Sequence, residues 1–192
     1  MSLHVDPLVL ALDAGGGGCR ASIYDRRGDR VAHAHCPWRA FVPPDLAPFG
    51  REYDVGALRD AVQSSIRAAA SSIDATRIAA LCCTGQRIAC AFVDELGETI
   101  YAGPNGDVRA LAAGDLRGLD DDVLYARTGR FPAWIFAPGR LRWFEAARPS
   151  EFQRIRHVLG LSNWIGFELT GVAATDATLA ADLMMFDVAT RS

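Results

Sequence analysis

The opening of the chain constrains the fold most, because three strand-like segments follow one another with only tight turns between them. These segments are residues 7–15, 20–25 and 30–38, separated by a run of glycines and by the turn 26–29. Connections this short join antiparallel neighbours, since parallel strands need a crossover of a dozen residues or more. The sequence therefore predicts a three-stranded antiparallel meander.

Helix and strand patterns alternate after this meander. Pro and Gly residues across 41–53 indicate an irregular surface loop. Asp54 is a suitable N-cap, and apolar residues then recur at helical spacing up to Ile73. Further strands are predicted at 78–84, 89–93 and 183–188, and further helices at 140–147, 150–156 and 162–169. This order predicts an α/β fold with a mixed sheet.

Composition narrows the classes of protein to consider. The chain has 192 residues, of which 50% are hydrophobic and 22% charged, so one globular domain is expected. A formal net charge of -3 provides no basic surface for nucleic acid or an anionic membrane. All 20 basic residues are Arg, which excludes a Walker-type P-loop with its obligatory Lys. No signal peptide or membrane span is recognisable, so we expect a cytoplasmic protein without nucleic-acid or membrane partners.

The cysteines and histidines indicate no metal site. Five cysteines without a CxxC pair are typical of free thiols in a reducing compartment, and we expect them to be small buried hydrophobic side chains. Cys82 and Cys83 are adjacent in a predicted strand and would point to opposite faces, which argues against a shared metal ion. His33 and His35 share one strand face and are interpreted as an exposed pair.

The first candidate for chemistry is Asp13 with the glycines that follow it: Gly15, Gly16, Gly17 and Gly18. Glycines adopt positive φ and leave backbone N–H groups open to an anion such as phosphate. Asp13, at the end of a strand, is placed to hold Mg2+ against phosphates. The next segment is a strand rather than a helix, so the dinucleotide-binding fingerprint is not matched. A glycine-rich hairpin turn without a ligand is the alternative.

Five segments in order resemble the FGGY family of carbohydrate kinases over nearly the whole chain. They are residues 10–15 with 20–28, Thr-Gly-Gln-Arg at 84–87, Asn-Gly-Asp-Val-Arg-Ala at 105–110, Arg-Leu-Arg-Trp-Phe at 140–144, and 169–171 with 175–177. The resemblance implies a ribonuclease H-like domain of the actin-like ATPase type, in which helices flank the meander. It also implies transfer of a phosphoryl group from ATP, with Mg2+, to a hydroxyl group of a sugar or polyol.

On the phosphate side, the resemblance implies a role for each residue of the glycine loop. Asp13 would organise Mg2+, and Arg20 would support the loop or its anion. The glycines Gly15, Gly16, Gly17 and Gly18 would face the phosphates. Family members usually carry Thr and Ser hydroxyls in this loop. Backbone amides remain here as donors, whereas side-chain donors to phosphate are lost.

On the substrate side, the resemblance implies that three residues point into the sugar pocket: Gln86, Arg87 and Asp107. Arg109 is expected to hold Asp107 in place rather than to touch the sugar. A plain surface ion pair between Asp107 and Arg109 is the alternative. Trp143 is expected in the core, and Asp176 is expected to cap a helix.

Departures from the family pattern bear on the choice of sugar. Ile88 stands where relatives with polyol or ketose substrates often carry Glu or His, and Ile135 stands where glycerol kinases carry Tyr. Both changes remove hydrogen-bonding groups and disfavour glycerol. Asn105 replaces a Trp, and Arg140 replaces a Lys. The Asn-x-Asp-x-Arg motif and residues 38–54 look most like autoinducer-2 kinases, so an autoinducer-2-like or ketose substrate is favoured.

The resemblance also implies that the chain is truncated. In this family the Asp that acts as catalytic base and the adenosine pocket lie further along, so residues 1–192 correspond to an incomplete N-terminal domain. No catalytic residue is assigned here, because the base is expected beyond Ser192, and we expect no kinase activity from this chain alone. Its partners would be a small-molecule sugar or polyol and the missing C-terminal domain, and a homodimer is compatible with the sequence.

Two other interpretations stay open. A non-catalytic sugar-sensing or regulatory module would account for the lost hydroxyl groups of the glycine loop. Another actin-like protein, such as a chaperone ATPase or an acetate-type kinase, would share the Asp-Gly hairpin but lacks the Gln86-Arg87 and Asp107-x-Arg109 elements. Calorimetry with magnesium-ATP and a panel of sugars on a longer chain discriminates the first alternative, because a sensor binds sugar without turning over ATP.

Overall fold

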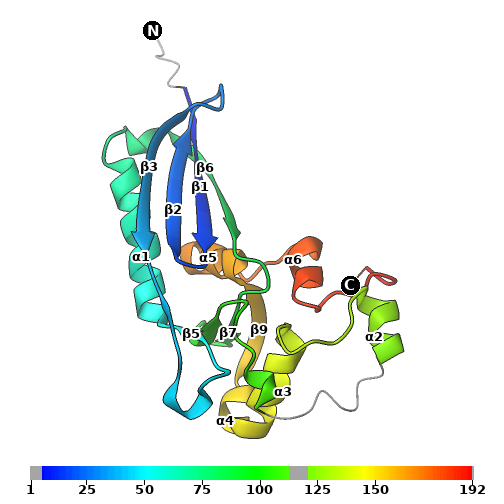
Figure 1. The fold of residues 1–192 in the computed structure, drawn as a ribbon. Coiled ribbons are helices and arrows are strands. Elements are labelled where there is room, and N and C mark those ends of the chain that lie inside the picture. The colour runs from blue at the N-terminus through cyan, green and yellow to red at the C-terminus, as the bar shows by residue number, and fades with distance from the viewer. Residues whose placement is uncertain (1–5, 113–120, 192) are drawn as a thin grey trace. The chain divides into compact units, whose positions relative to one another are not determined.

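The computed structural model describes residues 6–112 and 121–191 of the chain (Figure 1). Internal contacts divide these residues into two compact units. The first comprises the described residues up to Arg39 together with Gly56–Gly85, and the second comprises Ala40–Val55 together with the described residues from Gln86 onward. Each unit contains a sheet with its own core.

The sheet of the first unit has the strand order β3-β2-β1-β6. Its strands are β1 (Leu8–Gly15), β2 (Gly18–Tyr24), β3 (Arg30–Pro37) and β6 (Ile78–Gly85). The first three pair antiparallel, whereas β6 runs parallel to β1. This arrangement confirms the predicted meander and the mixed sheet.

One face of this sheet is covered by helix α1 (Val55–Ala70), which runs alongside it in Figure 1. Leu8 and Leu10 of β1 are buried, while Val9 between them remains 40% exposed, as the two-residue period of a strand requires. The apolar stripe that predicted α1 is buried too, at Leu58 and Val62. The helix and the strands therefore share one core.

The second unit is built on a three-stranded antiparallel sheet in the order β8-β7-β9. Its strands are β7 (Cys90–Asp94), β8 (Thr99–Gly103) and β9 (Ile155–Gly160), with a separate short pair formed by β4 (Ala40–Phe41) and β5 (Glu52–Tyr53). The helices are α2 (Asp121–Thr128), α3 (Ala137–Ala147), α4 (Pro149–Phe152), α5 (Leu161–Thr170) and α6 (Ala177–Asp182). Three-residue 3-10 turns lie at Pro44–Leu46, Ala75–Arg77 and Arg109–Leu111.

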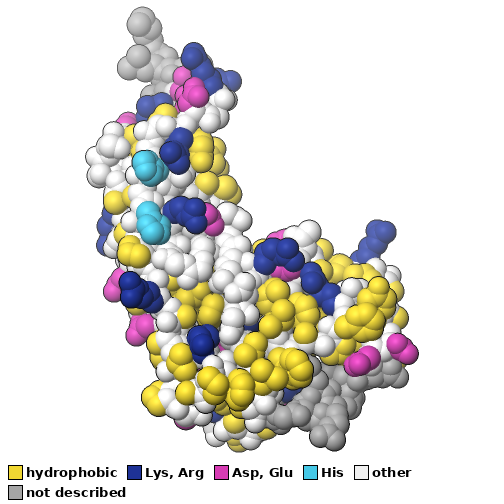
Figure 2. Space-filling model, in the orientation of Figure 1, with side chains coloured by type: hydrophobic (Ala, Val, Ile, Leu, Met, Phe, Trp, Pro, Cys, Tyr) yellow, Lys and Arg dark blue, Asp and Glu magenta, His cyan; other side chains and the backbone are white. Residues whose placement is uncertain are grey.

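Aromatic side chains fill the core of the second unit. Phe92 is fully buried, with its ring centroid 4.9 Å from that of Tyr101 and 5.4 Å from that of Phe144. Trp143 packs edge-on against Phe144 and is 5% exposed, which confirms its predicted place in the core. By contrast, α2 has no buried residue among those described, and exposed hydrophobic side chains gather around it (Figure 2).

One element prediction is wrong at the end of the described residues. The strand predicted at 183–188 does not form. Instead, α6 ends in a turn at Met184, whose φ is 63°. The N–H of Met184 donates a hydrogen bond to Ala181 O, and the N–H of Met185 donates one to Ala180 O. This is the bonding pattern of a left-handed helix cap, so a short apolar run was mistaken for a strand. Asp176 caps the start of α6, as predicted.

The helix predicted at 150–156 is only partly correct. Helix α4 ends at Phe152, and Ile155 begins β9, which pairs with β7. Pairing with a distant strand outweighs local preference in such a segment. Strand β8 was also missed, while the predicted irregular loop at 41–53 contains only the 3-10 turn and the short β4–β5 pair.

The cysteines are free thiols, but they are not uniformly buried. Cys19 and Cys90 are buried, whereas Cys82 is exposed on β6, which contradicts the expectation for that residue. Burial raises the pKa of the neighbouring Cys83 thiol to about 11. Among the described helices, none is both long and apolar enough to cross a lipid bilayer.

Candidate functional site

The glycine hairpin connects β1 to β2 in the first unit. Gly15 pairs with Gly18, and the exposed residues Gly16 and Gly17 form the turn between them. Trp38 holds the turn from the end of β3, because its backbone N–H donates to Gly17 O at 3.1 Å and its indole Nε1–H donates to Gly15 O at 3.1 Å. The turn therefore exposes backbone while its stem is fixed to the sheet.

Asp13 and Arg20 lie opposite each other on β1 and β2 beside this turn. Arg20 Nε is 3.5 Å from Asp13 Oδ2, and the two side chains are 61% and 42% exposed. Exposed ion pairs of this kind contribute little, so Arg20 does not prevent Asp13 from binding a cation. No group of three metal-ligating side chains occurs among the described residues. Asp13 fits a Mg2+ ion of the kind that one carboxylate holds together with substrate phosphates.

The glycines of the hairpin differ in the space around them, which yields a first prediction. A Cβ at Gly18 would overlap the side chain of His35 and lie 2.6 Å from Cys36 O, whereas nothing lies within 4 Å of a Cβ at Gly17. Gly18→Ala is expected to lower the free energy of unfolding by about 1–3 kcal/mol, because β3 must move away. Urea denaturation of Gly18→Ala and of a matched control variant measures this change in the free energy of unfolding.

Gly17→Ala is the matched control, since it makes the same chemical change one residue away. We expect it to change the free energy of unfolding by less than about 0.5 kcal/mol. Equal destabilisation by the two substitutions would contradict the close approach of β3 to Gly18.

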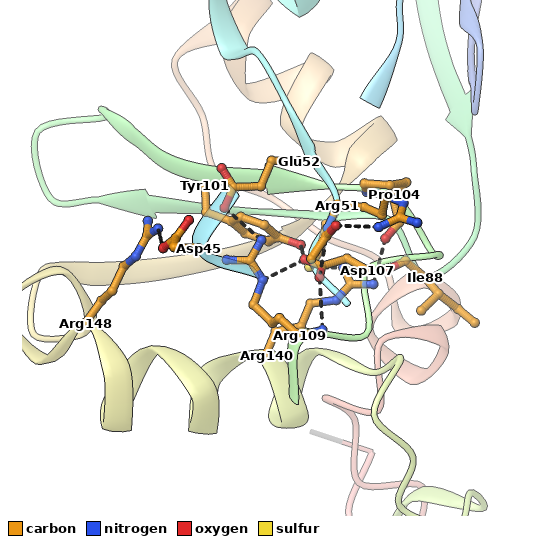
Figure 3. A network of polar contacts seen from close by, with 12 residues as sticks. Asp45, Arg51, Glu52, Ile88, Tyr101, Pro104, Asp107, Arg109, Arg140 and Arg148 are labelled. Atoms are coloured by element: carbon orange, nitrogen blue, oxygen red, sulfur yellow. Dashed lines mark hydrogen bonds and ion pairs between the residues drawn. The ribbon is translucent and has the colours of Figure 1, made fainter. Parts of the chain in front are cut away.

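In the second unit, Asp107 lies at the centre of a buried polar network (Figure 3). Its Oδ2 accepts hydrogen bonds from Tyr101 OH at 2.5 Å and Arg109 Nε at 2.8 Å. Its Oδ1 accepts from the backbone N–H groups of Arg51 at 3.3 Å and Arg109 at 3.1 Å. Both Asp107 and Arg109 are 0% exposed, so the alternative of a plain surface ion pair is wrong. Burial raises the pKa of Tyr101 well above its ordinary value, which keeps its hydroxyl a donor.

Arg109 joins this network to the aromatic core. Its guanidinium Cζ lies 4.4 Å from the ring centroid of Tyr101 and 4.8 Å from that of Trp143. Nη2 donates to Glu52 Oε1 at 2.8 Å, while Nη1 is buried without a hydrogen-bond partner among the described residues. Two carboxylates and two aromatic faces thus compensate one buried cation.

Gln86 bridges two other segments of the same unit. Its Oε1 accepts a hydrogen bond from Tyr53 OH at 3.0 Å, and its Nε2 donates to Asn105 Oδ1 at 2.8 Å. Asn105, which replaces a Trp of the family pattern, orients the Gln86 amide here. The two bonds join β5, the segment that begins at Gln86 and the loop after β8.

Arg87 is bound by a carboxylate that the sequence analysis did not identify. Its Nε is 3.2 Å from both Asp182 oxygens, and its Nη2 donates to Asp182 Oδ1 at 2.9 Å. Arg130 Nη2 donates to the same Oδ1 at 3.0 Å. Asp182 is 95 residues from Arg87 in sequence, so no local pattern could have connected them.

Arg140 holds the backbone of both loops that carry the predicted substrate residues. Its Nη1 donates to Ile88 O at 3.3 Å and to Cys90 Sγ at 3.2 Å, and its Nη2 donates to Pro104 O at 2.8 Å (Figure 3). The side chain is 0% exposed. An Arg at this position can bond two carbonyl groups with its planar fork, which a Lys cannot do in the same geometry.

The predicted site residues thus fall into four clusters. Asp13, the four glycines and Arg20 lie in the first unit. Gln86 with Asn105 and Tyr53, and Asp107 with Arg109, lie in the second unit, as does Arg87 with Asp182. Tyr53, Glu52, Arg130 and Asp182 were missed, because their partners are 33 to 95 residues away in sequence. Tyr101 was missed too, although Asp107 is only six residues away, because the strand that carries it was not predicted.

Hollows on the surface of each unit do not contain the predicted residues. One in the first unit is lined by residues that include Asp6, Asp25 and Arg77. One in the second unit is lined by residues that include Asp94 and Phe167. The predicted site residues lie in the hydrogen-bonded clusters described above and line neither of these two hollows.

Sequence comparison places this geometry in a family context. The model of the FGGY family of carbohydrate kinases, N-terminal domain, matches residues 8–192. The autoinducer-2 kinase of Salmonella choleraesuis (strain SC-B67) is 32% identical over 191 residues, which cover 96% of this chain and 36% of that protein. The autoinducer-2 kinase of Klebsiella pneumoniae is 30% identical over 190 residues, covering 95% and 35%. The chain therefore spans little more than a third of these relatives.

Solved structures agree on the fold. A xyloylose kinase from Brucella ovis superposes with a TM-score of 0.86 at 24% identity, covering 96% of this chain and 38% of that one. A gluconate kinase from Lactobacillus acidophilus gives 0.84 at 21% identity, covering 98% and 38%. The glycerol kinase of Plasmodium falciparum with ADP gives 0.82 at 17% identity, covering 97% and 39%. Likeness at this level of identity establishes the predicted fold class.

Proposed function

Because the chain belongs to the FGGY family of carbohydrate kinases, we propose that it is the N-terminal, sugar-binding part of an enzyme that transfers a phosphoryl group from ATP to a sugar hydroxyl. The observation that carries the proposal is the fixed Gln86–Arg87 segment, where the family resemblance implies substrate contacts. Gln86 is held by Tyr53 and Asn105, and Arg87 is held by Asp182. Donors fixed in this way can orient the hydroxyl groups of a sugar.

Asp107 receives a different role from the one the resemblance implied. A carboxylate with no exposed surface and four donors around it has no lone pair left for a sugar hydroxyl. We therefore assign Asp107 and Arg109 to support of the loop that carries Asn105. Gln86 and Arg87 remain as side chains that contact the sugar, and we add Asn105 because it binds the Gln86 amide.

On the phosphate side, the proposal assigns the exposed backbone of Gly16 and Gly17 to the ATP phosphates. Asp13 would hold Mg2+ beside them, and bound magnesium-ATP would supply the phosphoryl group. The structural support is the half-exposed carboxylate of Asp13 and the open space at Gly17. Gly15 and Gly18 shape the stem of the hairpin. Arg20 balances the negative charge of Asp13 when no cation is bound.

For the sugar itself, we propose an open-chain ketose or an autoinducer-2-like sugar rather than glycerol. Ile88 and Ile135 offer no hydrogen bond to a polyol. The most similar curated relatives named above are autoinducer-2 kinases, which supports this choice. The relatives are almost three times as long as this chain, so we place the catalytic base and the adenosine pocket in the part they have in addition.

Isothermal titration of the 192-residue chain with D-xylulose, D-gluconate and glycerol tests the sugar-binding assignment. We expect binding of D-xylulose that weakens about tenfold in Gln86→Ala, because one or two hydrogen bonds are lost. Gln153→Ala changes the same residue type at an exposed position of the same unit, and it should leave the affinity unchanged.

A coupled assay for ATP turnover completes this test. We expect no sugar-dependent turnover from the chain alone. A folded chain that binds none of the three sugars would contradict the assignment of the sugar site. Sugar-dependent turnover would contradict the placement of the catalytic base outside this chain.

A further inference from the structure

We propose that Asp182 is a positioning residue that presents Arg87 to the sugar. The proposal rests on the function proposed above and adds a residue that the family resemblance did not implicate. Asp182 is the last residue of α6, and its side chain is 8% exposed, whereas that of Arg87 is 72% exposed. A buried carboxylate thus holds a cation that is otherwise open to solvent.

The geometry of the contact restricts Arg87 strongly. Two nitrogens on one edge of the guanidinium group, Nε and Nη2, donate to the Asp182 carboxylate at 2.9–3.2 Å. Paired hydrogen bonds between Arg and a carboxylate set the plane of the guanidinium as well as its position. The third nitrogen, Nη1, has no partner among the described residues and is available to an oxygen atom of a ligand.

The location of Asp182 is unfavourable without its arginine partners. A carboxylate at the C-terminal end of a helix meets the negative end of the helix dipole, and its burial costs further free energy. Arg130 compensates part of this cost through its bond to Asp182 Oδ1, and its Nε donates to Ala181 O at 2.9 Å. With Arg130 already present, a second arginine on the same carboxylate is not required for charge balance. The contact between Asp182 and Arg87 therefore serves to fix the Arg87 side chain.

The backbone beside Arg87 is held as well. Ile88 has φ 67°, a conformation that is costly for a β-branched residue and that persists only where the surroundings enforce it. Arg140 bonds the carbonyl group of Ile88 from inside the core. Arg140 therefore holds the backbone of the residue after Arg87, and Asp182 holds the Arg87 guanidinium, an arrangement that reduces the ordering required when a sugar binds.

NMR of the 15N-labelled chain measures the proposed restraint directly. The Nε–H signal of Arg87, assigned with Arg87→Lys, should show a restricted heteronuclear NOE in the parent chain and a mobile one in Asp182→Asn. Asp94→Asn is the matched control, because Asp94 is also buried, at 6% side-chain exposure, and binds the exposed Arg154 at 2.6 Å. It should mobilise Arg154 and leave Arg87 unchanged.

Titration with D-xylulose links the restraint to the site. We expect Asp182→Asn to weaken binding roughly two- to tenfold, the cost of ordering one long side chain, and Asp94→Asn to have no effect. If the parent chain binds no sugar, the proposed function fails, and this inference fails with it. If the parent chain binds D-xylulose but Asp182→Asn binds equally well, or Arg87 is equally mobile in both, only the positioning role is overturned.

Discussion

Replacement of Arg109 by Met is expected to lower the free energy of unfolding by about 3–5 kcal/mol, because Asp107 would remain buried without its cation. Arg109 is 0% exposed and bonds both Asp107 and Glu52. Met can fill the space between the aromatic rings but cannot replace the charge. Urea denaturation followed by tryptophan fluorescence measures the change, since Trp143 lies 4.8 Å from the guanidinium carbon.

Arg148→Met is the matched control for this prediction. Arg148 also lies over Trp143, at 5.2 Å from the ring centroid, but its side chain is 30% exposed and its carboxylate partners are at the surface. We expect a loss below about 1 kcal/mol. Similar losses for both variants would show that packing over the ring, rather than buried charge, determines the stability of this region.

Phe92→Ala is expected to lower the free energy of unfolding by about 3–5 kcal/mol, because it opens a cavity in the centre of the second unit. Phe92 lies on β7 and packs against the rings of both Tyr101 and Phe144, and it is 0% exposed. The backbone on both sides is fixed by pairing with β8 and β9, so the cavity cannot close easily. Chemical denaturation gives the free energy directly.

Phe131→Ala provides the same substitution at a surface position. Phe131 is 59% exposed and stacks on Tyr125 with a centroid distance of 4.4 Å. We expect a loss of less than about 1 kcal/mol. Comparable losses for the two Phe variants would contradict the position assigned to Phe92 in the core.

Much of the first unit could be predicted from sequence, because its determinants are local. Short turns require antiparallel neighbours, and alternation along residues such as Leu10 and Leu12 identifies the buried face. The stripe that includes Leu58 and Val62 identified α1 for the same reason. The second unit was harder, since β9 forms only by pairing with β7, far away in the chain.

The candidate site could be predicted only in part. Gln86, Arg87 and Asp107 were found through their resemblance to family motifs, which named positions but not contacts. Arg109 was predicted as the partner of Asp107, and the structure shows this contact. The partners of Gln86 and Arg87 were not found, since Tyr53 and Asp182 are 33 and 95 residues away from the residues they bind. Ion pairs across such separations leave no periodic signal in the sequence.

The sequence by itself determined the strand order of the meander, the amphipathic helix α1, the membership in a family and the presence of a glycine turn beside a carboxylate. These features depend on neighbours within a few residues, which fix turns and buried faces. Tertiary structure alone decided that Asp107 is buried, that Asp182 binds Arg87, and that Arg140 holds the loops after β6 and β8. The physical reason is that the cost of burying a charge depends on which distant groups surround it in the folded chain.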